Sequence, residues 1–320
     1  MSFDVAILGA GVIGASAAFH LADRGYRVAV IGDGAPGASH AAAGMLSPSF
    51  EIGHDAADPA FAALMRDGLA LWDDFAHRVS SAPGRDFGYA RTGAYGIGYH
   101  AVPRGAERPR QARPLPAFSR QPTAFAPDEG LVEPAALIDV LLDRAAARGA
   151  RIIKARGQVV DGRVETAGET IGADTIILAC GAGAEGAPPG LQAVRGQAYV
   201  VRLAPEDAGA VPTVVRSPTA YFCPRRDGTL YVGATEEWPG AIAGTAEEVW
   251  RDAGRLLPAL GRATVLTRLA GSRPFLRRGG PVVERDRERG GLVRAQGHHR
   301  NGVLLAPWTA LRLEAILRAG

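Results

Sequence analysis

The stretch that decides the fold is Asp4-Val-Ala-Ile-Leu-Gly-Ala-Gly-Val-Ile-Gly14, in which a short apolar run leads directly into three spaced glycines. A helical pattern follows from Ala15 to Arg24, Gly25 ends it, and Arg27 to Ile31 forms a second apolar run. A glycine turn between a strand and a helix, with another strand after it, is typical of a dinucleotide-binding βαβ unit. The helix N-terminus then offers free N–H groups and a positive dipole end to phosphates.

Each glycine of the turn has its own role in such a unit. Gly9 permits the tight turn, Gly11 lets the backbone approach a pyrophosphate, and Gly14 lets the helix pack closely on the strand. The alternative is an ordinary glycine turn in a buried βα unit, which holds no ligand.

One position departs from the pattern at the end of the second strand. The acidic residue expected there to bind the ribose hydroxyls is replaced by Gly32, and Asp33 comes one residue later. Either Asp33 takes over through a shifted loop, or the backbone and a water hold the adenosine ribose. No basic residue stands there, so the pattern does not favour NADP.

Size and composition narrow the class of protein. The 320 residues suffice for two domains, and 47% hydrophobic with 22% charged residues is typical of a soluble globular protein. The net charge of +3 comes from scattered basic residues, so nucleic acid is not expected as a partner. The apolar N-terminus has no basic leader, and no run reaches the ~18 apolar residues of a membrane span. We expect a cytoplasmic protein.

Cys180 and Cys223 are the two cysteines of the chain. They do not form a disulfide framework, and a reducing compartment suits them. We expect Cys180 to be a small hydrophobic residue of a buried strand. Cys223 is expected in another strand, with covalent flavin attachment as an alternative. No CxxC or HExxH spacing occurs, so no metal site is predicted.

Apolar periodicity predicts the other elements. The segment Gly34 to Glu51 is predicted as a loop of small residues that runs against a ligand. Helices are expected over Asp58–Val79, from Glu133-Pro134 to just before Gly149, over Thr245–Leu257 (with a capping box of Thr245 and Glu248) and over Trp308–Arg318. Strands are expected over Thr92–Tyr99, Arg151–Lys154, Gln158–Ile171 (as a hairpin), Asp174–Gly183, Gln197–Leu203, Ala220–Pro224 and Leu230–Ala234, the last two joined by a turn at Asp227-Gly228.

The order of these elements predicts an α/β protein, α+β overall, with two interleaved domains. A Rossmann-like nucleotide-binding domain is expected over residues 1–80, 131–195 and 271–320. A strand-rich substrate domain with an antiparallel sheet is expected over 81–130 and 196–270.

Four separated pieces of sequence carry a resemblance to a known family. They are Gly9 to Gly14, Ala41-Ala-Ala-Gly-Met-Leu46 with Glu51, Asp174 to Gly183, and Gly297-His-His-Arg-Asn-Gly-Val-Leu-Leu-Ala-Pro307. Together they resemble the D-amino-acid-oxidase-type FAD oxidoreductases. The last piece, with Tyr221-Phe-Cys-Pro-Arg225 and Gly233-Ala-Thr-Glu-Glu237, most resembles the glycine oxidases of thiamine biosynthesis. The last piece is the most discriminating, since the first is shared by many flavin and NAD enzymes.

The resemblance implies FAD as the cofactor and a set of residues that hold it. The C-terminal glycine loop is expected to pass the N1–C2=O edge of the flavin ring, where backbone N–H groups stabilise the negative charge of the reduced form. The expected FAD-binding residues are Gly9, Gly11, Val12, Ile13, Gly14, Gly32, Asp33, Ser39, Ala43, Gly44, Met45, Val159, Gly181, Gly297, His298, His299, Arg300, Asn301, Gly302, Val303 and Leu304.

The resemblance also implies a substrate that carries an amine and a carboxylate. Arg273, in Gly271-Ser-Arg-Pro274, matches the family's carboxylate-binding arginine, and a guanidinium suits that task because it pairs in a two-pronged way. An apolar strand is expected before it. Arg300 matches a second substrate-side arginine, and Tyr221 matches a tyrosine whose hydroxyl contacts the carboxylate.

The implied reaction is oxidative deamination of glycine or a similar small amino acid. Hydride passes from the α-carbon to flavin N5, and oxygen reoxidises the flavin with release of hydrogen peroxide. Positioning suffices for this step, so no catalytic acid or base is expected and His298 and His299 are interpreted as structural. The alternatives are a D-amino-acid or N-methyl-amino-acid oxidase or dehydrogenase, and a flavin-binding module without turnover. The sequence leaves homo-oligomer formation open.

Overall fold

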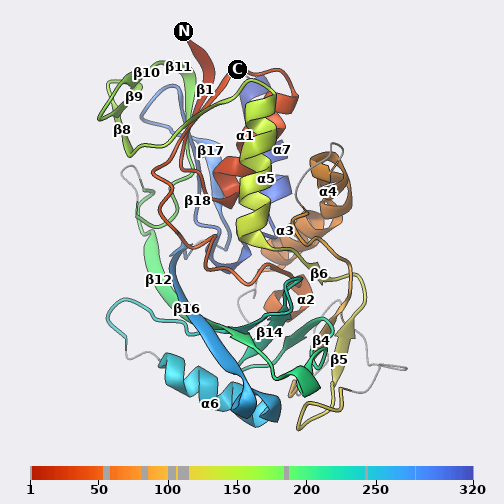
Figure 1. Cartoon of the computed structure of the whole chain (residues 1–320). Helices are drawn as coiled ribbons and strands as arrows, with labels where there is room; N and C mark the ends of the chain where they lie inside the picture. The colour runs from red at the N-terminus through yellow and green to blue at the C-terminus, as the bar shows by residue number, and fades with distance from the viewer. Residues whose placement is uncertain are drawn as a thin grey trace.

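The computed structural model of the chain describes residues 2–52, 58–80, 86–99, 106, 115–183, 187–241, 244–277 and 279–319. Much of the expected excursion over 81–130 lies outside the described residues. A six-stranded sheet with its helices forms one end of the molecule, and a seven-stranded sheet forms the other (Figure 1). The two long strands β12 and β16 reach from the middle of the molecule into the second end (Figure 1).

The first strand, turn and helix form as the sequence predicts. β1 (Phe3–Leu8) leads into α1 (Val12–Asp23), and β2 (Val28–Ile31) pairs with β1 in parallel. A Cβ on Gly14 would lie 1.8 Å from the Gly9 carbonyl oxygen, so only glycine allows the helix to pack this closely on the turn. α1 begins directly after the turn at Val12, whereas its apolar pattern indicates a start at Ala15, three residues later.

The six-stranded sheet has the order β17-β18-β11-β1-β2-β7. All pairs are parallel except that of β17 with β18, which is antiparallel. The remaining strands of this sheet are β7 (Arg151–Ile153), β11 (Ala173–Leu178), β17 (Val282–Arg285) and β18 (Leu292–Gln296). The expected strand up to Gly183 ends at Leu178. Cys180 therefore lies beyond the strand, where its Sγ donates to the Leu8 carbonyl 3.0 Å away.

The helices pack on the parallel sheet and around α1. α1 contacts both α5 (Pro134–Ala147) and α7 (Ala306–Arg318). The expected helix over 58–79 is divided into α3 (Pro59–Ala70) and α4 (Trp72–Ser80). Trp72 is fully buried and its Nε1 donates to the Leu304 carbonyl, so the second helix aligns on the C-terminal loop instead of continuing the first.

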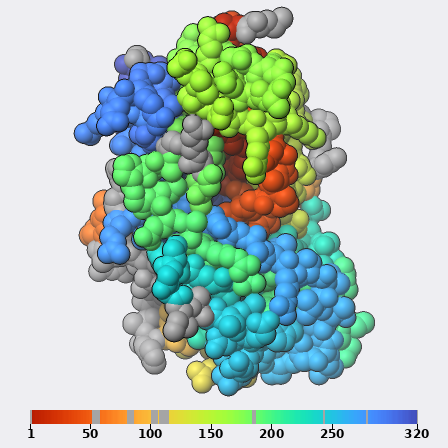
Figure 2. Space-filling model, turned by 90° about the vertical axis from the view of Figure 1, so that its left-hand side faces the viewer, coloured from red at the N-terminus to blue at the C-terminus, as the bar shows by residue number. Residues whose placement is uncertain are grey.

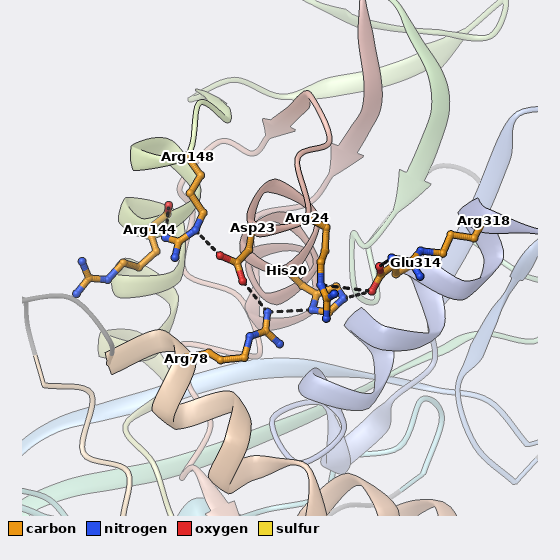
Figure 3. A network of polar contacts seen from close by, with 8 residues as sticks. All are labelled: His20, Asp23, Arg24, Arg78, Arg144, Arg148, Glu314 and Arg318. Carbon is orange, nitrogen blue, oxygen red and sulfur yellow. Dashed lines mark hydrogen bonds and ion pairs between the residues drawn. The ribbon is translucent and has the colours of Figure 1, made fainter.

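A cluster of charged side chains joins four of these helices (Figure 3). His20 of α1 is buried and its Nε2 lies 2.6 Å from Oε2 of Glu314 in α7. Asp23 of α1 pairs with Arg78 of α4 at 3.0 Å and with Arg148, which follows α5, at 2.6 Å. These pairs connect α1 to α4, to the residue after α5 and to α7.

The second sheet has the order β16-β12-β15-β14-β13-β4-β5 and is antiparallel except between β13 and β4. Its strands are β4 (Ala94–Gly96), β5 (Ala124–Ala126), β12 (Gln192–Arg202), β13 (Val214–Arg216), β14 (Tyr221–Pro224), β15 (Leu230–Gly233) and β16 (Thr264–Phe275). The hairpin of β14 and β15 confirms the predicted turn, and α6 (Ala246–Leu256) begins with the predicted capping box. The strand before Arg273 is the edge strand β16, and most of its residues are exposed although it contains the apolar Val265, Leu266 and Leu269.

Short elements complete the fold. The predicted loop over 34–51 contains β3 and a helical turn, α2, so it is more ordered than its small residues suggest. The segment after β7 forms the predicted hairpin. The elements are β3 (Met45–Leu46), α2 (Pro48–Ile52), β6 (Gly130–Leu131), β8 (Gly157–Val160), β9 (Arg163–Thr166), β10 (Thr170–Ile171) and the 3₁₀ turns η1 (Pro205–Asp207), η2 (Pro258–Arg262) and η3 (His299–Asn301). The fold is mixed α/β, as expected, whereas the division into two domains stays a prediction.

Candidate functional site

A cavity of about 1250 Å³ extends from the glycine turn of the parallel sheet to the face of the antiparallel sheet. Figure 2 shows its opening, where the red-orange segment near residues 30–50 lies beneath the yellow-green segment that holds β8 and β9. Every predicted site residue lines this cavity except Gly14, Val159 and Gly297. Gly157 and Gln158 line it in place of Val159. The structure therefore brings together residues from both ends and the middle of the chain.

At one end of the cavity, the N-terminus of α1 faces inward. Gly11 caps the helix without any side-chain hydrogen bond, so the first turn is not closed by its own sequence. The Val12 N–H donates to Ser39 Oγ at 3.1 Å, which draws the small-residue segment against the helix end. A helix N-terminus of this kind is suited to a pyrophosphate.

The neighbourhood of Gly32 explains the missing acidic residue. A Cβ at Gly32 would lie 2.6 Å from the Cβ of Ala10, so a larger side chain does not fit there without a shift of the turn. Asp33 lines the cavity, and its carboxylate accepts from the Ala35 N–H and from Arg156 Nε, both at 3.0 Å. These bonds lower the pKa of Asp33, the Ala35 N–H most of all.

The donors and the shape of this end fit FAD. The glycine turn leaves room that side chains would fill, and the helix end supplies N–H groups for phosphate. Gln296, which the sequence reasoning missed, lines the cavity at the end of β18. Its side-chain oxygen and nitrogen are buried and have no hydrogen-bond partner among the described residues. A buried amide whose oxygen and nitrogen are both unpaired is expected to bind a polar ligand.

The C-terminal glycine loop runs along the cavity as a tight turn. Residues 298–304 line the cavity between β18 and α7. His298 is buried with its Nε2 2.9 Å from Thr309 Oγ1, and burial lowers the pKa of His298 to about 3, so the imidazole is neutral. The His299 ring packs near Phe275 and Trp238, with centroids at 5.0 and 5.9 Å. His298 is thus held by Thr309 and His299 by ring packing, while a structural role for both stays a prediction.

At the other end of the cavity, Arg273 projects from β16. Its guanidinium lies over Gly196 of β12, where a Cβ would be only 2.4 Å from Nη1, so glycine makes the space that it occupies. Nη1 donates to the Thr235 carbonyl at 3.1 Å. Within the described part of the chain, Arg273 has no carboxylate partner. Arg273 is therefore a cation on the cavity wall that one hydrogen bond holds in place and whose charge no carboxylate among the described residues balances.

Tyr221 lines the same cavity and belongs to a stack of two tyrosines. Its ring is nearly parallel to that of Tyr231, with centroids 6.0 Å apart. The Tyr231 hydroxyl donates to the Ala41 carbonyl at 2.9 Å. Burial raises the pKa of Tyr231 well above its usual value, so both its charge state and its orientation are fixed. Tyr231 was not predicted, because its strand shows no separate signal for it.

Arg300, which was expected as a second substrate-side arginine, forms ion pairs with two glutamates of this chain. Its Nε lies 3.1 Å from Glu51 and its Nη1 lies 3.1 Å from Glu236. The buried Glu51 also pairs with Arg216 at 2.6 Å. Arg216 was missed by the sequence reasoning, and Glu51 entered it only through the resemblance. No local pattern predicts an ion pair between residues so far apart along the chain.

The parallel sheet, the glycine turn and the cavity shared with an antiparallel sheet define a dinucleotide-dependent oxidoreductase. Residues 4–315 match the family model described as DAO, FAD dependent oxidoreductase. The chain belongs to this family: it is an enzyme of the FAD-dependent amino acid oxidase class, and its cofactor is FAD.

Individual relatives of this chain have names that fit the same family. The glycine oxidase of Geobacillus kaustophilus is 31% identical over 353 residues, which cover 97% of this chain and 91% of the relative. The bifunctional protein ThiO/ThiG of Trichormus variabilis is 29% identical over 344 residues, which cover 97% of this chain and 52% of that protein. The crystal structure of glycine oxidase from G. kaustophilus superposes with a TM-score of 0.85 at 27% identity and covers 99% of this chain and 95% of that chain.

None of the helices in the described part of the chain combines the length and the apolar character that crossing a membrane requires. The same residues contain no group of three or more side chains arranged to hold a metal ion.

Proposed function

We propose that this enzyme oxidises glycine or a similar small amino acid to the imino acid, which water then hydrolyses to a keto acid and ammonia. The observation that carries the proposal is Arg273, a half-buried cation on the cavity wall without a carboxylate partner among the described residues. An amino-acid carboxylate supplies the missing counter-charge in a two-pronged geometry. The names of the relatives above support the same substrate class.

The protein's own groups act by binding and orientation. Arg273 fixes the carboxylate, and the hydroxyl of Tyr221, which lines the same cavity, is the second contact that we propose for it. Bound FAD would supply the two-electron oxidant for the substrate α-C–H bond, and we propose oxygen as the final electron acceptor. The neutral His298 supplies no proton near pH 7, so placement of the α-carbon is the main contribution of the chain.

The test is turnover with defined products. Protein loaded with FAD is mixed with glycine in air, and hydrogen peroxide, ammonia and glyoxylate are measured. We expect the three products in equal amounts. Sarcosine and D-alanine serve as the N-methyl and D-amino-acid comparisons, and faster turnover of either would assign the enzyme to that alternative. Absence of turnover with all three amines contradicts the proposal.

We further propose that the imino acid feeds formation of the thiazole of thiamine, as the names of the two-part relatives suggest. A bacterial host that lacks its own glycine oxidase should then grow without added thiazole when it expresses this chain. Turnover of glycine without such rescue would retain the activity and exclude the pathway.

A further inference from the structure

Arg216 is a buried arginine that the proposed reaction does not use. It ends β13, lines the cavity and is 2% exposed. Its guanidinium carbon lies 5.3 Å from the centroid of the Tyr221 ring, and its Nη1 lies 3.9 Å from Met45 Sδ. It therefore faces the same end of the cavity as the tyrosine stack.

The hydrogen-bonding capacity of Arg216 is only partly used. Nη1 pairs with Glu51, whereas Nε is buried and has no hydrogen-bond partner among the described residues. A buried guanidinium N–H without an acceptor is costly, because the group has left water and gained nothing in return. An acceptor in the cavity removes this cost.

The charges at this end of the cavity point to the kind of acceptor. Three arginines, Arg216, Arg273 and Arg300, stand against two glutamates, Glu51 and Glu236. Arg216 and Arg300 are paired with these glutamates, whereas Arg273 donates to a carbonyl and has no carboxylate partner among the described residues. An amino acid with two carboxylates offers one acceptor to Arg273 and another to the unused Nε of Arg216, whereas glycine offers only one.

We propose that Arg216 determines specificity by binding a second anionic group, so that the preferred substrates are amino acids with two carboxylates. The first carboxylate lies on Arg273, and to that extent the inference rests on the proposed function. The second carboxylate accepts from Arg216 Nε. Glycine then remains a minimal substrate that fills only part of the site.

The test measures binding without turnover. The FAD-loaded enzyme is titrated at pH 8 with succinate, which has two carboxylates, and with succinamate, in which an amide replaces one of them. The dissociation constants come from the change in the flavin absorption spectrum. We expect succinate to bind at least ~10-fold more tightly, the usual effect of a hydrogen bond to a buried charge. Equal affinities would overturn the inference.

Two variants assign the preference to one side chain. In Arg216→Met the ratio of the two constants should fall towards one. Arg225→Met is the matched control, since Arg225 also has a buried Nε without a partner and stacks on a tyrosine, at 5.6 Å from Tyr231, but does not line this cavity. Its ratio should equal that of the wild type. If Arg216→Met binds FAD and keeps the wild-type ratio of the two dissociation constants, the inference is overturned.

A further pair of amines checks the same preference in the reaction. D-aspartate should reduce the bound flavin at least ~10-fold more efficiently than D-asparagine, which differs only in the second carboxylate. If Arg216→Met does not fold, Arg216→Lys keeps the charge without Nε and should show a smaller preference for succinate. Failure of glycine to reduce the flavin would contradict the proposed function, while the succinate ratio is read independently of it.

Discussion

Arg273 is the side chain on which the proposed substrate position depends. Arg273→Ala should raise the KM for glycine by about 10- to 100-fold, because a charge-assisted pair with the carboxylate is lost. The visible spectrum of bound FAD should stay as in the wild type. Steady-state kinetics with glycine provide the measurement.

Arg268→Ala is the control on the same strand. Its side chain is exposed and pairs with Glu247 at the surface, so the KM should not change. An Arg273→Ala enzyme with unaltered affinity for glycine would remove this residue from the site.

Glu129 gives a pH-dependent prediction at the residue scale. Burial raises the pKa of Glu129 from 4.5 to about 7, although its Oε1 accepts from the Ser49 N–H at 2.6 Å. Since the folded protein holds this proton more tightly than the unfolded chain, its contribution to stability is present below pH 4.5 and is lost as the pH rises to 7. Glu129→Gln keeps an acceptor for Ser49 and stays neutral at every pH.

The free energy of unfolding of Glu129→Gln should therefore increase relative to that of the wild type as the pH rises. At pH 8 we expect the difference to be about 2–3 kcal/mol. Thermal unfolding at pH 4.5 and pH 8 provides the comparison. Parallel curves for the two proteins at both pH values would show that the carboxyl is not buried as described.

At the scale of elements, the contact of α1 with the glycine turn is the most demanding feature. Gly14→Ala places a methyl group into the Gly9 carbonyl, so the helix end must move away from the pyrophosphate position. We expect purified Gly14→Ala to lose most of its FAD on gel filtration. Gly254→Ala in α6, where a Cβ meets no atom within 4 Å, should retain FAD and gain up to about 1 kcal/mol.

The pair of His20 and Glu314 joins α1 to α7 and predicts an acid-sensitive contact (Figure 3). Although burial opposes it, the hydrogen bond from His20 lowers the pKa of Glu314 below its usual 4.5. A lowered carboxyl pKa stabilises the fold above pH 4.5, and this stabilisation is lost as the pH falls through the folded-state pKa.

Glu314→Gln should then cost about 2 kcal/mol of unfolding free energy at pH 7 and little at pH 3. Denaturant unfolding at the two pH values measures the difference. Arg318→Ala, at the exposed end of the same cluster, is the control and should change stability by less than about 0.5 kcal/mol. An equal loss of unfolding free energy in Glu314→Gln and Arg318→Ala would contradict a stabilising contact between His20 and Glu314.

Local signals predicted the elements that depend on neighbouring residues. The glycine turn at Gly9 to Gly14 and the capping box of Thr245 and Glu248 were both predicted, because their geometry is set within a few positions. The division at Leu71 was not predicted, since it follows from the bond of Trp72 to a carbonyl near the other end of the chain. The predicted site residues share one cavity for the most part.

What the sequence could not show is how charges pair across the cavity. Arg216 ends a strand in the antiparallel sheet, and its partner Glu51 lies in α2 after the small-residue segment. Nothing near either residue along the chain predicts that they meet, because the contact exists only once both sheets have formed. Arg300 was expected as a second substrate-side arginine, and its ion pairs with Glu51 and Glu236 were not predicted for the same reason.

At the scale of the whole molecule, one cavity joins the parallel sheet, whose glycine turn suits FAD, to the antiparallel sheet, where we propose that the amino acid binds. The cavity between them is continuous, so binding at its two ends is expected to be read by the same chromophore. The exposed edge strand β16 carries Arg273 into this junction, which explains why an otherwise solvent-facing strand contributes to the site.

The most direct test is the visible spectrum of the purified, FAD-loaded enzyme under anaerobic conditions as an amino acid is added. We expect a flavin spectrum that bleaches with glycine, bleaches at lower concentration with D-aspartate, and recovers its colour on admission of air. A protein that does not retain FAD, or whose bound flavin stays oxidised with every amino acid tested, would contradict the account.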